Sequence, residues 1–290
     1  MVLRNVVAPS GTDRHYEPVV LGGRREISIS TSKFNAELLG RPTATGIDAV
    51  TTLRHFSIVT YAIPPDRLRP LIDPRFELDC VDVNGAPKAL LSVVPFEDRD
   101  FRAAALPSPR WRFGQTNYRI YIRDRTGRRA VWFLGTVLGS WTVALPRYIW
   151  RLPWHYGRFV FKCPQDPSGR YSSYVVETES QWAPAHLELV HEPGEDLSFP
   201  GFPDAETALV LLTHPLTGYY TRRDGRVGTY SVWHNRLLPD AGRVRVARFG
   251  LLDRLGLVPL PEQSKPYSVL IQPTTEFLVR LPPRPWQEGM

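Results

Sequence analysis

The stretch LPRYIWRLPWHYGRFVF, residues 145–161, is the most informative part of this chain. An aromatic and basic segment runs as far as Pro153, and the apolar run 159–161 follows shortly after Trp154 and His155. Because aromatic and β-branched residues favour strands, the second half of the stretch predicts a strand. The imidazole of His155, which changes charge near neutral pH, is therefore a candidate general acid or base at the junction of two elements.

Working outward, short apolar runs alternate with turn residues along the rest of the chain. Residues 55–61 alternate in the manner of a strand, and the pairs Asn84-Gly85 and Asp224-Gly225 predict type I′ hairpin turns. Asp204 is a candidate N-cap for a short helix over residues 205–212. About a dozen short strands with three or four short helices indicate a mainly β (α+β) fold. Closing the strands into an antiparallel barrel would remove exposed edges, which favours a barrel over an open sheet.

Length and composition are those of a globular chain with one main domain. The chain has 290 residues, of which 42% are hydrophobic and 22% are charged, and this is sufficient to bury a core. We expect residues 46–285 to form a single domain, because no linker-like stretch interrupts them. Residues 1–45 are poorly periodic and are predicted to be an N-terminal extension without a core of its own.

Charge and cysteine content bear on partners and compartment. The net charge is +7, but much of the excess lies in short arginine pairs in or near predicted turns, which favours a solvated surface over a nucleic-acid-binding one. No stretch reaches the roughly 18 apolar residues of a membrane helix, and no apolar signal-peptide core is present at the N-terminus. The two cysteines, Cys80 and Cys163, lack metal-ligand spacing. The sequence therefore predicts a cytoplasmic protein that binds neither nucleic acid nor a membrane.

Common catalytic and cofactor motifs are absent from the sequence. It has no glycine-rich dinucleotide or phosphate loop, no G-x-S-x-G and no H-E-x-x-H, so nucleotide chemistry and the common hydrolase mechanisms lose support. His186, Glu188 and His191 are close in sequence, but on a strand His191 would point away from the other two. We therefore expect neither a metal site nor a cofactor.

Two further positions carry groups suited to an anion or a carbonyl. Arg54 begins the first clear strand, and an arginine can hold a carboxylate through two parallel hydrogen bonds. Residues 115–119, QTNYR, place five polar-capable side chains in a row. Strand alternation sends Asn117 and Arg119 to one face and Tyr118 to the other. Either Asn117 or Tyr118 is thus a candidate ligand contact inside a barrel.

Five segments of the chain occur in the same order and at similar spacing as in a known protein family. They are RHFSIVTYAIPPDRLRPLI, LLSVVPF, TNYRIYIRD with AVWFL, LPRYIWRLPWHYGRFVF and PYSVLIQPTTEFLVRLPP. From Arg54 to about Pro283 the chain resembles the YqjF-like proteins, a bacterial family of unknown function in the acetoacetate decarboxylase-like superfamily. The resemblance implies an antiparallel, cone-shaped β-barrel with a few short helices.

The resemblance also implies where a site would lie. Acetoacetate decarboxylases carry an arginine before the first strand, a glutamate entering a middle strand and two lysines after a proline, the first of which forms a Schiff base with the keto substrate. The arginine matches Arg54, and the glutamate falls on Asn117 or Tyr118. The two lysines fall on Trp154 and His155, which cannot form a Schiff base. The resemblance thus implies a cavity lined by these residues, with different chemistry.

The first functional hypothesis is a small-molecule enzyme that acts on a carbonyl or carboxylate compound by acid–base catalysis. His155 would carry the proton and Arg54 would bind the anion. Asn117 or Tyr118 would donate to a developing oxyanion, and Trp154 would line the ligand site. The alternative is a small-ligand-binding barrel that acts as a carrier or sensor. A third hypothesis, nucleic-acid association, rests on the net charge alone, and a homo-oligomer is expected by analogy with the superfamily.

Overall fold

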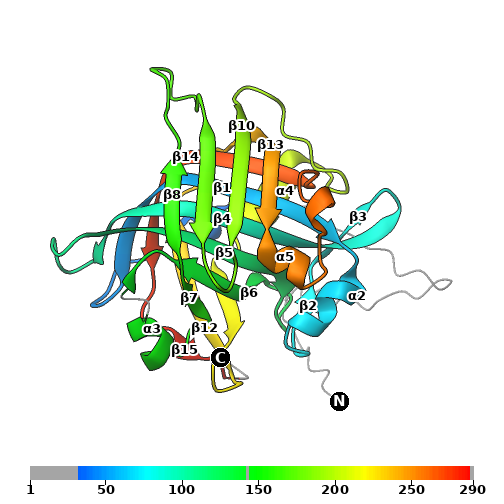
Figure 1. Cartoon of the computed structure of the whole chain (residues 1–290). Coiled ribbons are helices and arrows are strands. Elements are labelled where there is room, and N and C mark those ends of the chain that lie inside the picture. Colours follow the sequence, from blue (N-terminus) through cyan, green and yellow to red (C-terminus); the bar gives the residue numbers. More distant parts are fainter. Residues whose placement is uncertain (1–31, 142–143, 288–290) are drawn as a thin grey trace, which may run out of the picture.

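A ring of seven strands forms the centre of the computed structural model, which describes residues 32–141 and 144–287 (Figure 1). The ring strands are β1 (Ala49–Ile63), β4 (Ala86–Ala103), β5 (Trp111–Arg123), β6 (Arg129–Leu138), β11 (Thr217–Thr221), β12 (Val227–His234) and β14 (Ser268–Val279). Each strand pairs with the next in the order β14, β1, β4, β5, β6, β11, β12, and the pairing of β12 with β14 closes the ring. Neighbours in the ring are antiparallel except β6 and β11.

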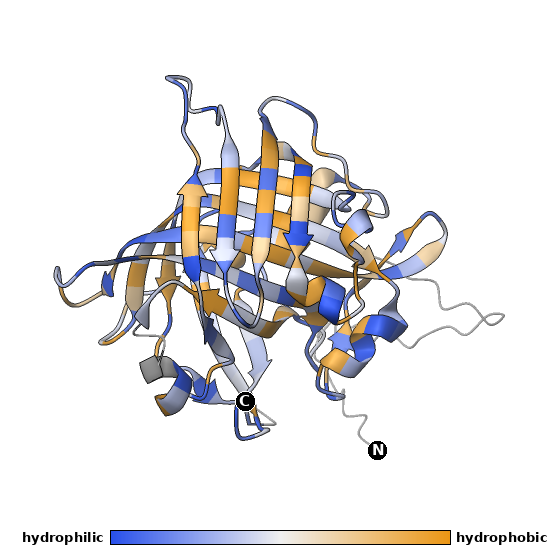
Figure 2. Ribbon diagram, viewed as in Figure 1, coloured by the Kyte–Doolittle hydropathy of each residue, from blue (hydrophilic) through white to orange (hydrophobic). Residues whose placement is uncertain are grey.

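A second group of strands folds over one side of the ring. These strands are β8 (Arg158–Lys162), β9 (Tyr174–Glu179), β10 (Ala185–Glu192) and β13 (Asp240–Phe249), and β13 continues the hydrogen bonding from β14. In Figure 1 the labelled strands β8, β10 and β13 cross the ring strands β1, β4 and β5 at a steep angle. Figure 2 shows hydrophilic and hydrophobic residues alternating along β10 and β13. Such alternation is typical of a sheet with one face packed and the other in solvent.

The helices are short and lie around the strands. They are α1 (Ala36–Leu39), α2 (Pro65–Leu68), α3 (Ala144–Ile149), α4 (Ala205–Thr213) and α5 (Gly250–Arg254), with 3₁₀ turns η1 (Arg69–Leu71) and η3 (Leu260–Glu262). Four short strands complete the sheet: β2 (Glu77–Leu78), β3 (Cys80–Val83), β7 (Trp154–Tyr156) and β15 (Arg284–Pro285). The Asp204 side chain accepts a hydrogen bond from the Thr207 N–H at 2.6 Å, so the predicted N-cap of α4 is confirmed.

Two apolar clusters lie on opposite faces of the ring strands. The interior cluster includes Leu53, Phe56, Val94, Phe96, Tyr121, Phe133, Tyr220 and Leu270 of the ring, the partly buried Tyr230 and Phe277, and Ala208, Leu211 and Leu212 of α4. Because all seven ring strands contribute to it, this cluster fills the inside of the ring. The outer cluster includes Val59, Leu91, Val93, Tyr118, Ile120, Trp132 and Tyr219, packed with Val176, Leu187, Leu189 and Val244 of the crossing strands.

The mainly β fold class is confirmed, and some local predictions need correction. Asn84 and Gly85 both have positive φ, of 56° and 78°, as a type I′ turn requires. In the β11–β12 hairpin only Gly225 has positive φ, so the predicted type I′ turn at Asp224-Gly225 is wrong. The predicted barrel was antiparallel, but β6 pairs in parallel with β7 and β11. The sequence did not predict this exception, since alternation indicates which face of a strand is buried and not the direction of the neighbouring strand.

The predicted domain division, with a 1–45 extension and a 46–285 domain, stays a prediction, and residues 1–31 lie outside the described residues. No helix among residues 32–141 and 144–287 is long and apolar enough to cross a membrane.

Substituting Gly218 with alanine is expected to destabilise the ring. A Cβ at this position would lie 2.3 Å from the Phe133 ring, which lies over the glycine inside the packed interior. Overpacking of this kind costs about 1–3 kcal/mol. The change can be measured as the free energy of unfolding in urea, with Thr221→Ala, an exposed position on the same strand, as the control. A Gly218→Ala value within about 0.5 kcal/mol of the control contradicts the prediction.

Candidate functional site

Arg119 places a positive charge on the interior face of the ring. One terminal nitrogen of its guanidinium donates to the carbonyl of Leu212 at 2.8 Å and contacts the hydroxyl of Tyr121 at 3.3 Å. Its Nε is buried and has no hydrogen-bond partner among the described residues. Within residues 32–141 and 144–287, Arg119 forms no ion pair with a carboxylate. A partly buried charge without a counter-ion is costly to the free protein, so this arginine is a candidate anion-binding group.

The hydrogen bond to the end of α4 uses only one terminal nitrogen of the Arg119 guanidinium. The Leu212 carbonyl also accepts a hydrogen bond from the Tyr121 hydroxyl at 3.0 Å. That hydroxyl is held in turn by Ser92 at 2.9 Å. The end of α4 is therefore capped without Arg119, and most of the arginine's N–H groups remain available to a ligand.

Asn117 lies two residues before Arg119 on the same face of β5. Its Oδ1 accepts hydrogen bonds from Gln115 Nε2 at 2.9 Å and from Thr136 Oγ1 at 2.8 Å. These two donors assign the orientation of the amide, so Nδ2 is a donor with no acceptor among the described residues. Residues two apart on a strand are separated by roughly 7 Å. Arg119 and Asn117 thus place a cation and a hydrogen-bond donor on the same face of β5, two residues apart along the strand.

Trp154 completes a row across the interior face. β7 pairs in parallel with β6, which sets Trp154 beside Thr136, and Thr136 is itself paired with Asn117. The Trp154 side chain packs against the interior cluster. The position that the resemblance assigns to the Schiff-base lysine therefore faces the same interior as Asn117.

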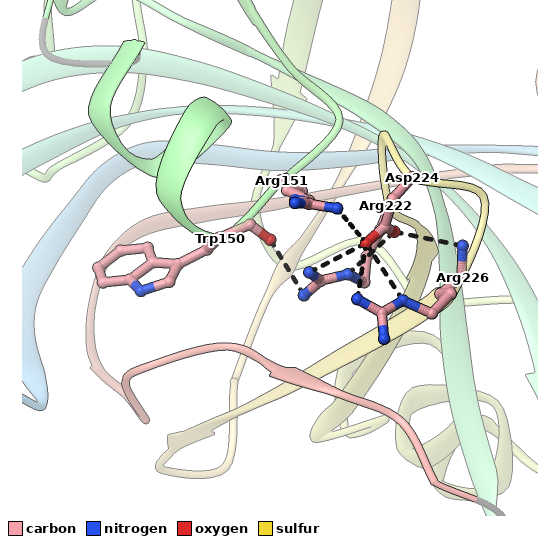
Figure 3. A network of polar contacts seen from close by, with 5 residues as sticks. All are labelled: Trp150, Arg151, Arg222, Asp224 and Arg226. Carbon is pink, nitrogen blue, oxygen red and sulfur yellow. Dashed lines mark hydrogen bonds and ion pairs between the residues drawn. The ribbon is translucent and has the colours of Figure 1, made fainter.

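An ion-pair network fixes the segment that leads into β7. The Asp224 carboxylate contacts Arg222 at 3.2 Å, Arg226 at 3.0 Å and Arg151 at 2.5 Å, as Figure 3 shows. Arg222 also donates to the carbonyl of Trp150 at 3.5 Å. These arginines hold the pKa of Asp224 well below its usual range. These contacts connect the β11–β12 hairpin to Trp150 and Arg151, which lie between α3 and β7, and so help to position Trp154 at the start of β7.

Tyr118 and His155 lie on the outer face instead. The His155 ring stacks on Trp182 with centroids 4.1 Å apart, and Tyr118 meets the same indole edge-on at 5.7 Å. Burial, together with the positive charges of Arg147 and Arg223, lowers the pKa of His155 to about 4. His155 is therefore neutral at pH 7 and packed against an aromatic ring.

Arg54 also lies on the outer face, beside an irregularity in β1. His55 has a φ of +52°, and the pairing with β4 shifts register after Arg54. The His55 Nδ1 lies 2.9 Å from the Tyr171 hydroxyl, and burial lowers the pKa of His55 to about 4. Arg54 forms no hydrogen bond or ion pair within the part of the chain that the structure describes.

The resemblance implies one cavity lined by Arg54, Asn117 or Tyr118, Trp154 and His155, but the ring divides these residues between its two faces. Strand alternation and the closure of the ring separate these five residues, with Asn117 and Trp154 inside and Arg54, Tyr118 and His155 outside. The functional roles of these residues stay predictions.

Two interior residues, Arg119 and Tyr220, were not among the site residues predicted from the sequence. Strand alternation had placed Arg119 on the same face as Asn117, and this two-residue spacing is the sequence signal that could have identified it. The Tyr220 hydroxyl is buried and has no hydrogen-bond partner in the part of the chain that the structure describes, and burial raises its pKa to about 12. Its ring lies over Gly228, where a Cβ would approach within 2.4 Å. No local sequence signal marks Tyr220, because its position inside the ring depends on the pairing of β11 with β6.

Comparisons with known proteins agree with this architecture. The DUF2071 family, described as "Uncharacterized conserved protein", matches residues 50–275. None of the curated proteins compared with the chain is similar to it.

Among solved structures, an acetoacetate decarboxylase from Legionella pneumophila has a TM-score of 0.53 at 14% identity, covering 87% of this chain and 93% of that one. The enduracididine biosynthesis enzyme MppR, complexed with pyruvate, has a TM-score of 0.52 at 13% identity, covering 85% and 93%. An acetoacetate decarboxylase-like enzyme from Sphingomonas wittichii has a TM-score of 0.52 at 10% identity, covering 84% and 95%. At these identities the likeness shows the acetoacetate decarboxylase-like fold alone.

Proposed function

Because the chain belongs to the DUF2071 family and has the acetoacetate decarboxylase-like fold, we propose that it is an enzyme that activates a small oxo acid inside the ring. The substrate class is a carboxylate that carries a carbonyl group nearby. The observation that carries the proposal is Arg119, an interior arginine with a buried unpaired Nε and no carboxylate partner among the described residues. Bidentate pairing with a carboxylate would satisfy both its charge and its donors.

The chemistry follows from the donor beside that cation. With the carboxylate on Arg119, the Asn117 Nδ2–H would donate to the carbonyl oxygen of the substrate. As a proton leaves the carbon next to the carbonyl, the electron pair moves to that oxygen, and the hydrogen bond to the oxyanion strengthens. Water accepts the proton in this scheme. No covalent bond forms between the protein and the substrate in this reaction.

The lysines of the chain support a mechanism other than a Schiff base. The chain has four of them, and Lys33, Lys162 and Lys265 are exposed. Lys162 forms an ion pair with Glu177 at 3.2 Å. Lys88 lies in the β3–β4 hairpin opposite Val81. Trp154 occupies the position that the resemblance gives to the reactive lysine, and its indole would instead form an apolar wall for the substrate.

Two relatives by fold suggest probes. The MppR structure is a complex with pyruvate, and the Legionella protein is named an acetoacetate decarboxylase. Both compounds are small oxo acids. Pyruvate and acetoacetate are therefore the first ligands to test on this chain.

The test is proton exchange in D₂O, followed by ¹H NMR. We expect the chain to accelerate loss of the pyruvate methyl signal over buffer, with saturation as pyruvate concentration rises. Asn117→Ala should lower the rate constant by about 100-fold, the effect of removing one donor to an oxyanion. Thr136→Ala, which removes a donor to Asn117 but not the amide itself, is the milder control.

Each outcome of this test has a definite meaning. Saturable binding with neither exchange nor product favours the alternative, a carrier or sensor. Neither binding nor exchange with either compound contradicts the proposal. Loss of exchange in His155→Ala or Arg54→Ala, with Asn117→Ala unaffected, would instead support the roles that the sequence predicts for those residues on the outer face. Assembly into a homo-oligomer and a cytoplasmic location stay predictions, and light scattering would test the first.

A further inference from the structure

A pocket opens in the wall of the ring where β12 changes partners. β12 pairs with β14 at Val232 and with β15 at Thr229, so Tyr230 and Ser231 lie between the two ladders. The pocket at this break has a volume of about 270 Å³. That is the liquid volume of about nine water molecules, which is ample for a small oxo acid.

Tyr230 belongs both to the pocket and to the interior of the ring. It lines the pocket, and its ring also stacks on Phe133 with centroids 5.4 Å apart and an interplanar angle of 15°. On the inner side it meets Tyr220 at 6.2 Å. Its hydroxyl makes no hydrogen bond within the described residues. Tyr230 therefore separates the pocket from the interior cluster. Packing against Phe133 and Tyr220, and not a polar contact, keeps its side chain in place.

Arg119 lies behind this partition. Phe133, on which Tyr230 stacks, is the strand partner of Arg119. Burial raises the pKa of Tyr230, Tyr220 raises it further, and the positive charge of Arg119 lowers it. Arg119 is thus close enough to Tyr230 to act on its hydroxyl electrostatically.

The outer side of the pocket carries a positive charge. Arg280 lines it and is paired with the buried carboxylate of Asp48 at 3.4 Å. Arg284 also lines it, is exposed, and forms no ion pair within the part of the chain that the structure describes. Since the Arg280 charge is offset by Asp48, the uncompensated charge at the rim is that of Arg284. A rim of one sign raises the local concentration of ligands of the opposite sign.

We infer that this pocket is the entrance through which small carboxylates reach Arg119, with Arg284 as the group that attracts them and Tyr230 as the side chain that moves aside. The inference rests on the proposed function for the identity of the ligand, but not for the existence of the route. Movement of Tyr230 would exchange its stacking on Phe133 for contact with solvent in the pocket. Rotamer changes of a partly exposed aromatic side chain are fast compared with typical turnover.

The route can be tested by thiol labelling without any substrate. Asn117→Cys places a thiol inside the ring, and the full-length variant is treated with a negatively charged or a positively charged methanethiosulfonate of similar size. Peptide mass spectrometry follows the rate at residue 117, with the native Cys163 as an internal reference outside the ring. We expect the anionic reagent to react at least about 10-fold faster, and Arg284→Glu to abolish this preference. Arg248→Glu, an exposed site on β13, is the matched control.

The second part of the test replaces Tyr230 and measures labelling at residue 117 again. Tyr230→Ala should raise the labelling rate at residue 117 at least about 10-fold with both reagents, while Cys163 labels as before. If Tyr230→Ala and Arg284→Glu leave the rate at residue 117 unchanged, or if this thiol reacts only after unfolding, the entrance is wrong. Pyruvate binding that requires Arg119 would still stand in that case. Conversely, the expected labelling pattern without pyruvate or acetoacetate binding refutes the proposed function alone.

Discussion

Replacing Arg119 with methionine is expected to abolish oxo-acid binding while leaving the protein folded. Removing one member of a buried, hydrogen-bonded charge pair costs about 2 kcal/mol or more, which weakens binding of pyruvate by about 30-fold or more. The free protein should lose little, because Tyr121 still caps the Leu212 carbonyl and an unpaired interior charge is removed. We expect the free energy of unfolding to fall by less than about 1 kcal/mol, or to rise. Ligand-observed NMR titration and urea unfolding measure the two quantities.

The matched control is Arg54→Met. Arg54 is also an arginine without a partner among the described residues, but it lies on the outer face of β1. We expect Arg54→Met to bind pyruvate as the unchanged protein does. If Arg54→Met loses binding and Arg119→Met retains it, Arg54 is the anion-binding group, as the resemblance to the decarboxylases implies, and the anion site lies on the outer face of the ring. If Arg119→Met loses several kcal/mol of stability, the arginine is a structural cap of α4 rather than a ligand group.

Replacing Asp98 with asparagine is expected to stabilise the protein at neutral and higher pH. Asp98 is buried on the interior face, where Oδ1 accepts a hydrogen bond from Thr51 at 2.9 Å and Oδ2 has no partner within residues 32–141 and 144–287. Burial and the negative charge of Glu97 raise its pKa to about 7, although the Thr51 hydrogen bond acts in the opposite direction. In the unfolded chain the same carboxyl has its ordinary pKa of 3.8. Folding therefore favours the protonated form of Asp98.

The pH dependence follows from that difference. Below about pH 4 Asp98 is protonated in both states, so Asp98→Asn should change stability little. Between about pH 4 and pH 7 the unfolded chain loses the proton while the folded one keeps it, and the contribution of Asp98 to stability falls by roughly 1.4 kcal/mol per pH unit. The advantage of Asp98→Asn should therefore grow to roughly 4 kcal/mol by pH 8.

Urea unfolding of both proteins at pH 4, 6 and 8 measures this advantage, and the comparison cancels the titration of all other groups. The control is Asp100→Asn, because Asp100 is on the same strand and its side chain is about half exposed. A difference between Asp98→Asn and the unchanged protein that stays constant over this range contradicts a raised pKa. If Asp100→Asn shows the same pH-dependent gain in stability, the gain comes from the change in net charge and not from the burial of Asp98.

Local sequence determined the elements of the fold. The apolar alternation of residues 55–61 predicted a strand, and they lie in β1. Asp204 predicted the start of α4, because a carboxylate at that position satisfies a free N–H of the first turn. Asn84-Gly85 predicted its hairpin turn, because both residues tolerate positive φ. Each of these features depends on interactions between residues close in sequence, and such interactions can be recognised without knowing the fold.

The interior of the ring was decided by tertiary structure alone. Alternation divides β5 into a face with Asn117 and Arg119 and a face with Tyr118, but it does not say which face is inside. The choice depends on ring closure by β12 and β14, strands that begin about 110 and 150 residues further along the chain. Whether an arginine is paired depends likewise on carboxylates that only folding brings near. The sequence by itself therefore determined the strands and the mainly β fold class, and ring closure decided that Arg119, rather than Arg54, faces the interior, where it has no carboxylate partner among the described residues.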